Sequence, residues 1–138
     1  MKPATVVVSL PITDLDRSLR FYRDGLDLPA PDVDEGGILF ELPNLSLFLI
    51  EKSEYATYTD RAGMTTQIGP TAGACIISCA IGSKEEVDDV LARASKAGGS
   101  VTGPADEYDG SYMGYFSDPD GHVWELVFNA HTEAAAAQ

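Results

Sequence analysis

The sequence has few cysteines, few basic residues and no long apolar run, and each shortage excludes a kind of protein. Its two cysteines, Cys75 and Cys79, are four positions apart. On one strand they would lie roughly 13 Å apart, too far for a disulfide, so we interpret them as buried small apolar residues. No apolar run approaches the roughly 20 residues of a membrane span. We predict a cytoplasmic protein with no export signal and no membrane contact.

Basic residues are scarce as well, with nine lysines and arginines against 22 acidic residues and a formal net charge of -13. A field of this sign repels phosphate backbones, so nucleic acid is not expected as a partner. The same field favours a cationic ligand, although its simplest role is solubility. The 138 residues, 44% of them hydrophobic, suffice for one domain with a real core.

The first half of the chain predicts a strand, a helix and then a hairpin. Residues 5–12 are rich in β-branched side chains and predict a strand. Asp14 is a good N-cap for the helix that follows, and Gly25 ends that helix. After a loop rich in proline and glycine, residues 38–42 and 45–51 predict a hairpin.

The second half repeats this order. Residues 74–81 predict a strand, and Ser83 with Glu86 forms a capping box at the start of a second helix. Residues 112–116 and 122–128 form the last predicted hairpin.

The two halves keep one register. Ile12 and Ile81 are 69 positions apart, and so are the predicted helix caps Asp14 and Ser83. A duplicated β-α-β-β-β unit is the simplest explanation. The predicted parts are module one at about 5–51, a linker at 52–73, module two at about 74–129 and a tail at 130–138. The linker is either a plain connection or a lid, and the tail is expected to be frayed.

This duplication predicts an α+β fold. The helix of each module covers one face of a small sheet, and two modules side by side make a curved mixed sheet with a concave inner face. Concave, mostly apolar surfaces are where small ligands bind.

Two segments resemble known family motifs. Residues 9–22 resemble the opening motif of the vicinal oxygen chelate superfamily, and residues 114–126 resemble its closing motif. The superfamily includes glyoxalases, bleomycin-resistance proteins and extradiol dioxygenases, and Trp124 and Asn129 resemble its glyoxalase-like branch. Its members are metal-dependent lyases and isomerases, ring-cleaving dioxygenases, thiol transferases and metal-free drug-binding proteins. The resemblance implies a homodimer, with modules paired within a chain or exchanged between chains.

The resemblance also implies four metal-ligand positions on the first and last strands of the modules. In this sequence they hold Val7, Phe48, Ile76 and Glu125. Only the last side chain can ligate, whereas a metal such as zinc takes about three or four protein ligands. We therefore predict that the standard metal site and any cofactor are lacking. A rearranged site built from Glu51, His122 and Glu125 remains as an alternative.

Strand alternation places Glu125 in the predicted bowl, among apolar residues. There it is a candidate catalytic general base, an acceptor for a ligand N–H or O–H, or the counter-ion of a cation. The opposing interpretation is a structural hydrogen bond to Ser9 or Ser78. One of two tyrosines, at 112 and 115, should face the bowl. The predicted ligand-binding residues are Val7, Ser9, Phe48, Ile76, Ser78, Tyr112, Tyr115 and Glu125.

These observations favour a small-molecule-binding protein without the standard metal site, whose ligand is cationic or aromatic. The alternative is a glyoxalase-like lyase or isomerase, or a dioxygenase. Such an enzyme would depend on a metal or use Glu125 as acid or base. The sequence leaves open whether the chain is an enzyme.

Overall fold

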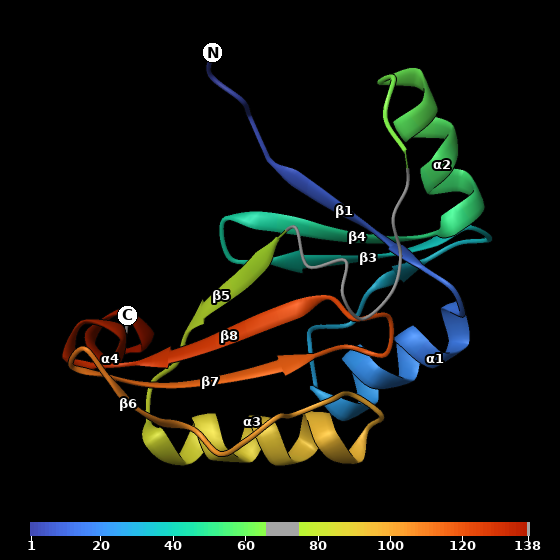
Figure 1. Cartoon of the computed structure of the whole chain (residues 1–138). Coiled ribbons are helices and arrows are strands. Elements are labelled where there is room, and N and C mark those ends of the chain that lie inside the picture. The colour runs from blue at the N-terminus through green and yellow to red at the C-terminus, as the bar shows by residue number, and fades with distance from the viewer. Residues whose placement is uncertain (66–74, 138) are drawn as a thin grey trace.

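The fold is a pair of β-α-β-β-β modules, as the repeat predicts (Figure 1). The structure is a computed structural model that describes residues 1–65 and 75–137. Each module is a four-stranded mixed sheet with helical structure between its first and second strands. The α+β class and the duplication are confirmed, and the strands are divided between two separate sheets.

Module one has the strand order β1-β4-β3-β2, in which β1 and β4 are parallel and the other pairs are antiparallel. Its elements are β1 (Val7–Ile12), α1 (Leu15–Leu19), η1 (Arg20–Gly25), β2 (Asp32–Val33), β3 (Gly37–Leu42) and β4 (Leu45–Glu51). The short strand β2 lies in the segment that the prolines and glycines predicted as loop.

Module two repeats the arrangement with the order β5-β8-β7-β6. Again the first and last strands are parallel and the others antiparallel. Its elements are β5 (Ile76–Ala80), α3 (Lys84–Lys96), β6 (Asp106–Tyr108), β7 (Ser111–Ser117) and β8 (Val123–Phe128).

Both module helices begin at the predicted caps. The Asp14 carboxylate accepts a hydrogen bond from the Arg17 amide at 3.0 Å, and the Ser83 hydroxyl accepts one from the Glu86 amide at 3.1 Å. These bonds satisfy amides that the first turn of a helix leaves without a partner. The first helix continues as the π-helical turn η1, with a bond from the Leu26 amide to the Phe21 carbonyl at 3.0 Å.

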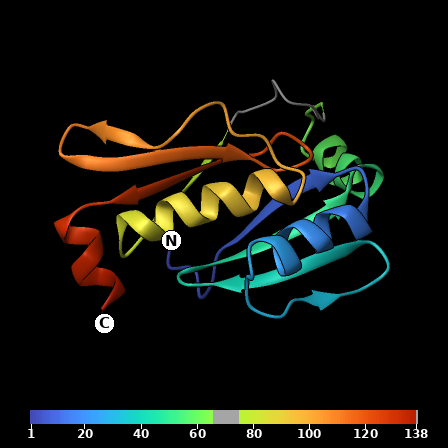
Figure 2. The same cartoon turned by 90° about the horizontal axis from the view of Figure 1, so that it is seen from below.

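The two modules share one hydrophobic core. Helices α1 and α3 lie on the same side of the two sheets, below them in Figure 1 and in front of them in Figure 2. Between them, Phe21 and Tyr22 of η1 meet Phe116 and Trp124 of module two, with ring centroids 5.8–6.1 Å apart between the modules. This aromatic cluster packs the modules against each other, so neither has an independent core.

Helix α3 packs tightly onto β7 because residue 114 is glycine. A Cβ atom at Gly114 would lie 2.7 Å from Cδ1 of Leu91 and 3.3 Å from Cβ of Ala105. The missing side chain lets the helix approach the backbone of the strand.

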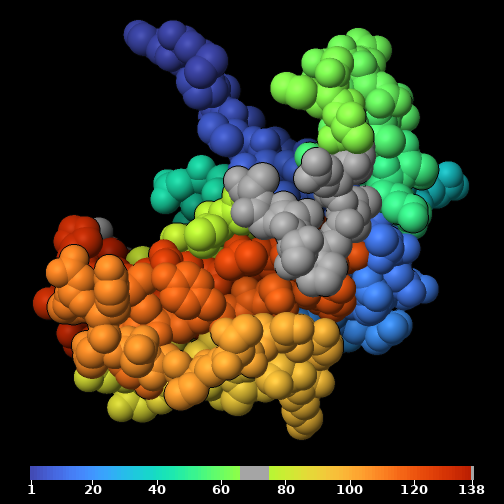
Figure 3. All heavy atoms as spheres, in the orientation of Figure 1, coloured from blue at the N-terminus to red at the C-terminus, as the bar shows by residue number. Residues whose placement is uncertain are grey.

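The predicted linker contains a helix. Helix α2 (Lys52–Arg61) follows β4 directly, has no buried residue and projects from the body (Figure 3). The remaining linker residues from 66 onward lie outside the described residues. The expectation of a plain connection or lid missed this helix because its sequence has no apolar stripe.

The predicted frayed tail also forms a helix, α4 (Ala130–Ala136). Asn129 and Thr132 close a capping box at its start, with side chain to backbone bonds of 2.9 and 2.8 Å. The alanines that follow have the highest helix propensity. The prediction was wrong because it gave more weight to nearness to the chain end than to this cap.

The cysteines differ from each other. Cys79 is half-buried on the helix side of β5 and packs against the core, whereas Cys75 precedes the strand and is exposed. The expectation of two buried cysteines was therefore wrong for Cys75. Among the described residues, none of the helices is long and apolar enough to span a membrane.

Candidate functional site

Three polar side chains form a row across the sheet of module two. Glu125 lies on β8, and its register neighbours are Ser78 on β5 and Tyr115 on β7. The Ser78 hydroxyl donates to Oε1 of Glu125 at 2.8 Å, and the Tyr115 hydroxyl donates a short hydrogen bond to Oε2. We call these three residues the polar row. Each carboxylate oxygen retains a lone pair for a ligand donor.

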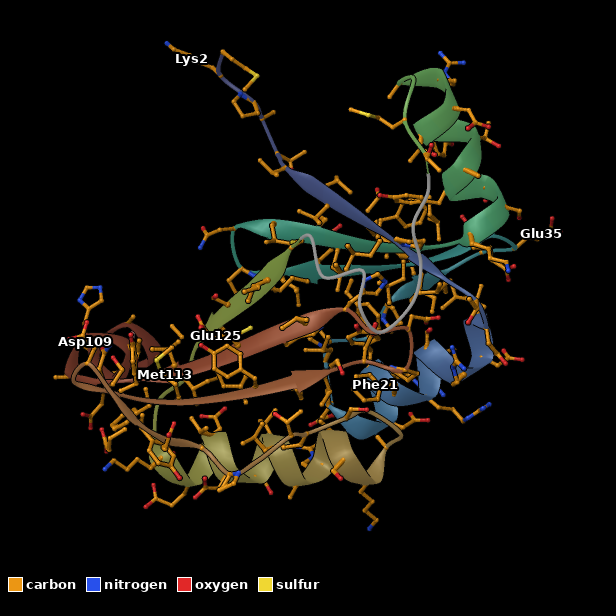
Figure 4. All side chains as sticks on the ribbon, viewed as in Figure 1. Lys2, Phe21, Glu35, Asp109, Met113 and Glu125 are labelled. Atoms are coloured by element: carbon orange, nitrogen blue, oxygen red, sulfur yellow. The ribbon has the colours of Figure 1, made fainter. Side chains whose placement is uncertain are left out.

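The polar row lies on the open face of the sheet, opposite helix α3 (Figure 4). Alternation along β8 explains this, because its neighbours Trp124 and Leu126 are each 3% exposed and point into the core. The predicted orientation of Glu125 is confirmed, and so is the hydrogen bond to Ser78 that formed the alternative interpretation.

The two tyrosines lie on opposite faces. Tyr115 belongs to the polar row, and its hydrogen bond to Glu125 raises the pKa of the phenol, which keeps its proton and donates. Tyr112 lies on the helix face and donates to Asp88 of α3 at 2.6 Å. The sequence listed both as ligand-binding, and we remove Tyr112 because it is turned toward the helix.

Module one carries an equivalent row in which the acid is replaced. Ser9 of β1, Phe48 of β4 and Leu39 of β3 are register neighbours, in the places of Ser78, Glu125 and Tyr115. The duplication therefore keeps the serine and exchanges a hydrogen-bonding pair for two apolar side chains.

Phe48 is held over the backbone of the adjacent strand. A Cβ atom at Gly37 would lie 2.6 Å from Cε1 of the Phe48 ring. The ring therefore occupies the space that a side chain at position 37 would fill.

An apolar pocket of about 350 Å³ opens on this face, with two acidic residues at its edge. Its lining residues are Val7, Asp32, Val33, Asp34, Leu39 and Phe48. Two of the predicted ligand-binding residues are among them. Asp32 and Val33 were missed because they belong to β2, which lies in a segment predicted as loop.

The sequence predicts a concave surface on which Glu125 lies among the apolar side chains of Val7, Phe48 and Ile76. Of these four residues, the pocket is lined by Val7 and Phe48, which belong to module one. Ile76 and Glu125, which belong to module two, do not line it. Val7 is 52% exposed and Ile76 is 56% exposed. Glu125 is half-buried, and the enclosure of its carboxylate by Val7, Phe48 and Ile76 stays a prediction.

The four family positions do not fit a metal ion. Three hold valine, phenylalanine and isoleucine, and the oxygens of Glu125 already accept bonds from two hydroxyl groups. A second copy of the chain would bring the same residues, so pairing between chains would not supply the missing ligands. In the part of the chain that the structure describes, no group of three possible ligands is close enough to hold a metal.

The rearranged metal site is not formed either. His122 precedes β8, and its Nε2 atom lies 2.7 Å from the Pro11 carbonyl oxygen at the end of β1. This contact joins the two modules and directs the imidazole to the backbone of module one.

The turn of the closing motif fastens module two to the first helix. Asp120 is buried, and its Oδ1 atom accepts bonds from the Thr13 amide (3.1 Å), the Thr13 hydroxyl (2.7 Å) and Arg17 (3.0 Å). Its Oδ2 atom lies 3.4 Å from the Ser18 hydroxyl. The sequence indicated a turn here but did not show that its acid binds the opposite module.

Asp118 completes this connection from the same turn. It is buried, and its carboxylate accepts bonds from the Tyr22 hydroxyl at 2.6 Å and the His122 amide at 2.8 Å. Burial raises the pKa of Asp118 above 3.8, against the lowering effects of His122 and the Tyr22 hydrogen bond. Burial also raises the pKa of Tyr22 well above its ordinary value, so the phenol stays a donor.

This raised pKa predicts a pH effect on stability. The folded protein binds a proton at Asp118 more tightly than the unfolded chain does, so this carboxyl favours folding most below its unfolded pKa of 3.8. The contribution is lost as pH rises through the folded pKa. Relative to an Asp118→Asn variant, wild type should therefore be more stable at about pH 4 than at pH 7. Urea unfolding of both proteins measures this, and a difference that grows with pH contradicts it.

Comparison with known proteins is consistent with this geometry. The model of the Glyoxalase/Bleomycin resistance protein/Dioxygenase superfamily matches residues 5–126. No curated protein sequence matches the chain. A solved glyoxalase-related enzyme from Fulvimarina pelagi is 29% identical with a TM-score of 0.78, and the match covers 91% of this chain and 87% of that one.

Two further structures share the fold at lower identity. Lactoylglutathione lyase from Agrobacterium tumefaciens is 22% identical with a TM-score of 0.65, over 92% of this chain and 95% of that one. The oxidase ChaP-H1 is 23% identical with a TM-score of 0.63, over 94% and 98%. The reactions of these relatives differ, so the shared fold does not assign one.

Proposed function

Because the chain belongs to the Glyoxalase/Bleomycin resistance protein/Dioxygenase superfamily, we propose that it is a metal-free protein that binds a small organic molecule. The ligand lies on the open faces of the sheets, and Glu125 is its polar anchor. The observation that carries this proposal is the polar row, in which Ser78 and Tyr115 hold the Glu125 carboxylate on the face opposite helix α3 (Figure 4).

The polar row suits recognition of a donor or a cation. Two hydroxyl groups hold the carboxylate in one orientation, which lowers the side-chain entropy that the protein loses when a ligand binds. The carboxylate accepts an N–H or O–H of the ligand, or stands opposite its positive charge. The Tyr115 side chain is 43% exposed and offers a flat surface beside this contact.

The formal net charge of -13 supports a cationic ligand rather than an anionic one or a nucleic acid. A homodimer and a cytoplasmic location stay predictions. A dimer would suit the proposal, because a second copy could cover Val7 and Ile76 on the open faces.

Replacing Glu125 with glutamine tests the proposal. The variant keeps the shape of the side chain and loses its charge, so affinity for a cationic ligand should fall about tenfold or more. The first step is a thermal-shift screen of wild type against cationic antibiotics and aromatic amines, with native mass spectrometry to detect a ligand carried through purification. Isothermal titration of each responding compound then gives its Kd with wild type and with Glu125→Gln.

Glu41→Gln is the matched control. Glu41 lies on the open face of module one and accepts a hydrogen bond from the Ser46 hydroxyl at 2.6 Å, so the substitution changes the same group beside the same kind of donor. It should leave the affinity unchanged. Equal affinity of wild type and Glu125→Gln, or no response to any compound, would refute the proposed anchor.

A second candidate function is metal-independent acid–base catalysis by Glu125. The observation in its favour is the hydrogen bond from Tyr115, which can hold a phenolic proton against the carboxylate while Glu125 accepts one from a substrate. If the chain is such an isomerase or lyase, Glu125→Gln abolishes turnover and retains substrate binding. Retained turnover would exclude this role.

A further inference from the structure

The module-one pocket combines apolar walls with an acidic edge. Its walls are Val7, Val33, Leu39 and Phe48, and its acids are Asp32 on β2 and Asp34 just after it. Its volume of about 350 Å³ lies within the range of roughly 300–1,000 Å³ that is usual for small-molecule sites. The polar row is not part of this pocket, so it offers a second set of contacts on the open faces.

The apolar walls are incompletely covered within the chain. Val7 is 52% exposed and Val33 is 48% exposed. A ligand that covers such side chains gains about 25 cal/mol for each Å² of apolar surface removed from water. The walls therefore favour a ligand with an apolar body.

The Phe48 ring is a suitable wall for a flat or positively charged group. The close approach to Gly37 keeps the ring against the sheet, as the 2.6 Å distance from a Cβ at that position shows. A fixed aromatic ring attracts a cation through its quadrupole and offers a stacking surface to another ring.

The acidic edge makes the pocket selective for positive charge. Asp34 Oδ1 accepts bonds from the amides of Gly36 and Gly37, both at 3.1 Å, which fixes its position. The Asp32 carboxylate makes no hydrogen bond or ion pair with any described residue. It is therefore available as a counter-ion.

The surroundings of the pocket have the same sign. Asp34 also lines a neighbouring hollow with Glu35, Glu51 and Glu54. Among the described residues that line the two depressions there is no lysine or arginine. A ligand cation would therefore meet carboxylates without a competing basic side chain, and an anionic ligand would be repelled.

We propose that the module-one pocket binds an organic cation with a flat apolar body, an arylammonium compound being the simplest example. The apolar body lies against Phe48 and Leu39, and the positive group faces Asp32. This inference rests on the proposed function, since it names the class of molecule that binds the open faces. It differs from that proposal in depending on Asp32 and Phe48 rather than on Glu125.

Three probes separate the contribution of the aromatic ring from that of the positive charge. At pH 7, phenyltrimethylammonium has both the ring and the charge, N,N-dimethylaniline is neutral and has the ring alone, and tetramethylammonium has the charge alone. Each is titrated into ¹⁵N-labelled full-length protein while amide chemical shifts are followed. Phenyltrimethylammonium should bind most tightly, with its largest shifts at the amides of Val7, Val33 and Leu39.

Two substitutions test the named contacts. Asp32→Asn should weaken phenyltrimethylammonium binding about threefold, the effect of one exposed ion pair, and leave N,N-dimethylaniline unchanged. Phe48→Ala should weaken it by about tenfold, because the apolar wall and the cation–π contact are both lost. Phe48→Leu, which keeps most of the volume and removes the aromatic face, replaces Phe48→Ala if that variant does not fold.

Asp106→Asn is the control for net charge. Asp106 lies on β6, the edge strand of module two, and its substitution removes one negative charge as Asp32→Asn does. An equal loss of affinity in both variants would overturn the inference, and so would tighter binding of N,N-dimethylaniline than of the cation. Absence of any shift with phenyltrimethylammonium would overturn it as well.

Glu125→Gln separates this inference from the proposed function. If Glu125→Gln loses binding and Asp32→Asn does not, with shifts confined to Ser78, Tyr115 and Glu125, the pocket assignment fails and the proposed anchor stands. If Asp32→Asn alone weakens binding of phenyltrimethylammonium, the pocket assignment stands, and Glu125 is not a contact of this ligand.

Discussion

Replacing Phe21 with alanine is expected to lower the free energy of unfolding by about 3–5 kcal/mol, the usual cost of removing a buried aromatic side chain. The Phe21 ring is fully buried, lies 5.0 Å from the Tyr22 ring and 6.1 Å from that of Phe116, and so joins η1 to module two. Domains of this kind are stable by only about 5–15 kcal/mol, so the variant should be partly unfolded at moderate urea concentrations.

Phe48→Ala is the matched control for this prediction. It makes the same substitution on the open face, where the side chain is only half-buried. Its loss of stability should be less than half that of Phe21→Ala, because the removed ring leaves a solvent-filled space rather than a cavity. Urea unfolding followed by circular dichroism compares the two. Equal losses of stability would contradict the prediction that the Phe21 ring, in the core shared by the two modules, contributes more to stability than the Phe48 ring.

Replacing Asp120 with alanine should destabilise the fold by roughly 2–3 kcal/mol, because it removes the acceptor of several donors at once. The Thr13 amide and hydroxyl, Arg17 and Ser18 would lose their bond to this buried carboxylate. Since these donors belong to module one, the variant should also loosen the contact between modules. Amide exchange should rise at α1 and in the turn before β8.

Asp89→Ala supplies the comparison for a surface acid. Asp89 is exposed on α3 and pairs with Arg93 at 3.7 Å, so its removal should change stability by no more than about 0.5 kcal/mol. Calorimetry of both variants against wild type measures the difference. A cost for Asp120→Ala as small as that for Asp89→Ala would mean that water replaces the carboxylate at the module contact.

The amino-acid sequence was sufficient for the duplicated order of the longer strands and the two module helices, and for the face on which Glu125 lies. Both follow from local periodicity: the 69-residue offset repeats a cap and a strand end, and alternation along β8 sets Glu125 opposite its buried neighbours. Helix caps such as Asp14 and Ser83 are equally local, since each acts on an amide three residues away. Properties of this kind depend on short stretches of chain, which the sequence records directly.

Tertiary structure alone decided which tyrosine accompanies Glu125 and which residues form the apolar pocket. The choice between Tyr112 and Tyr115 depends on the register of β7 against β8, a pairing of separate strands. The pocket depends on β2 pairing with β3, which brings Asp32 beside Leu39 although its own segment has no strand signal. The turn acids bind residues about 100 positions away. Such contacts are selected by packing over the whole domain, and no local pattern encodes them.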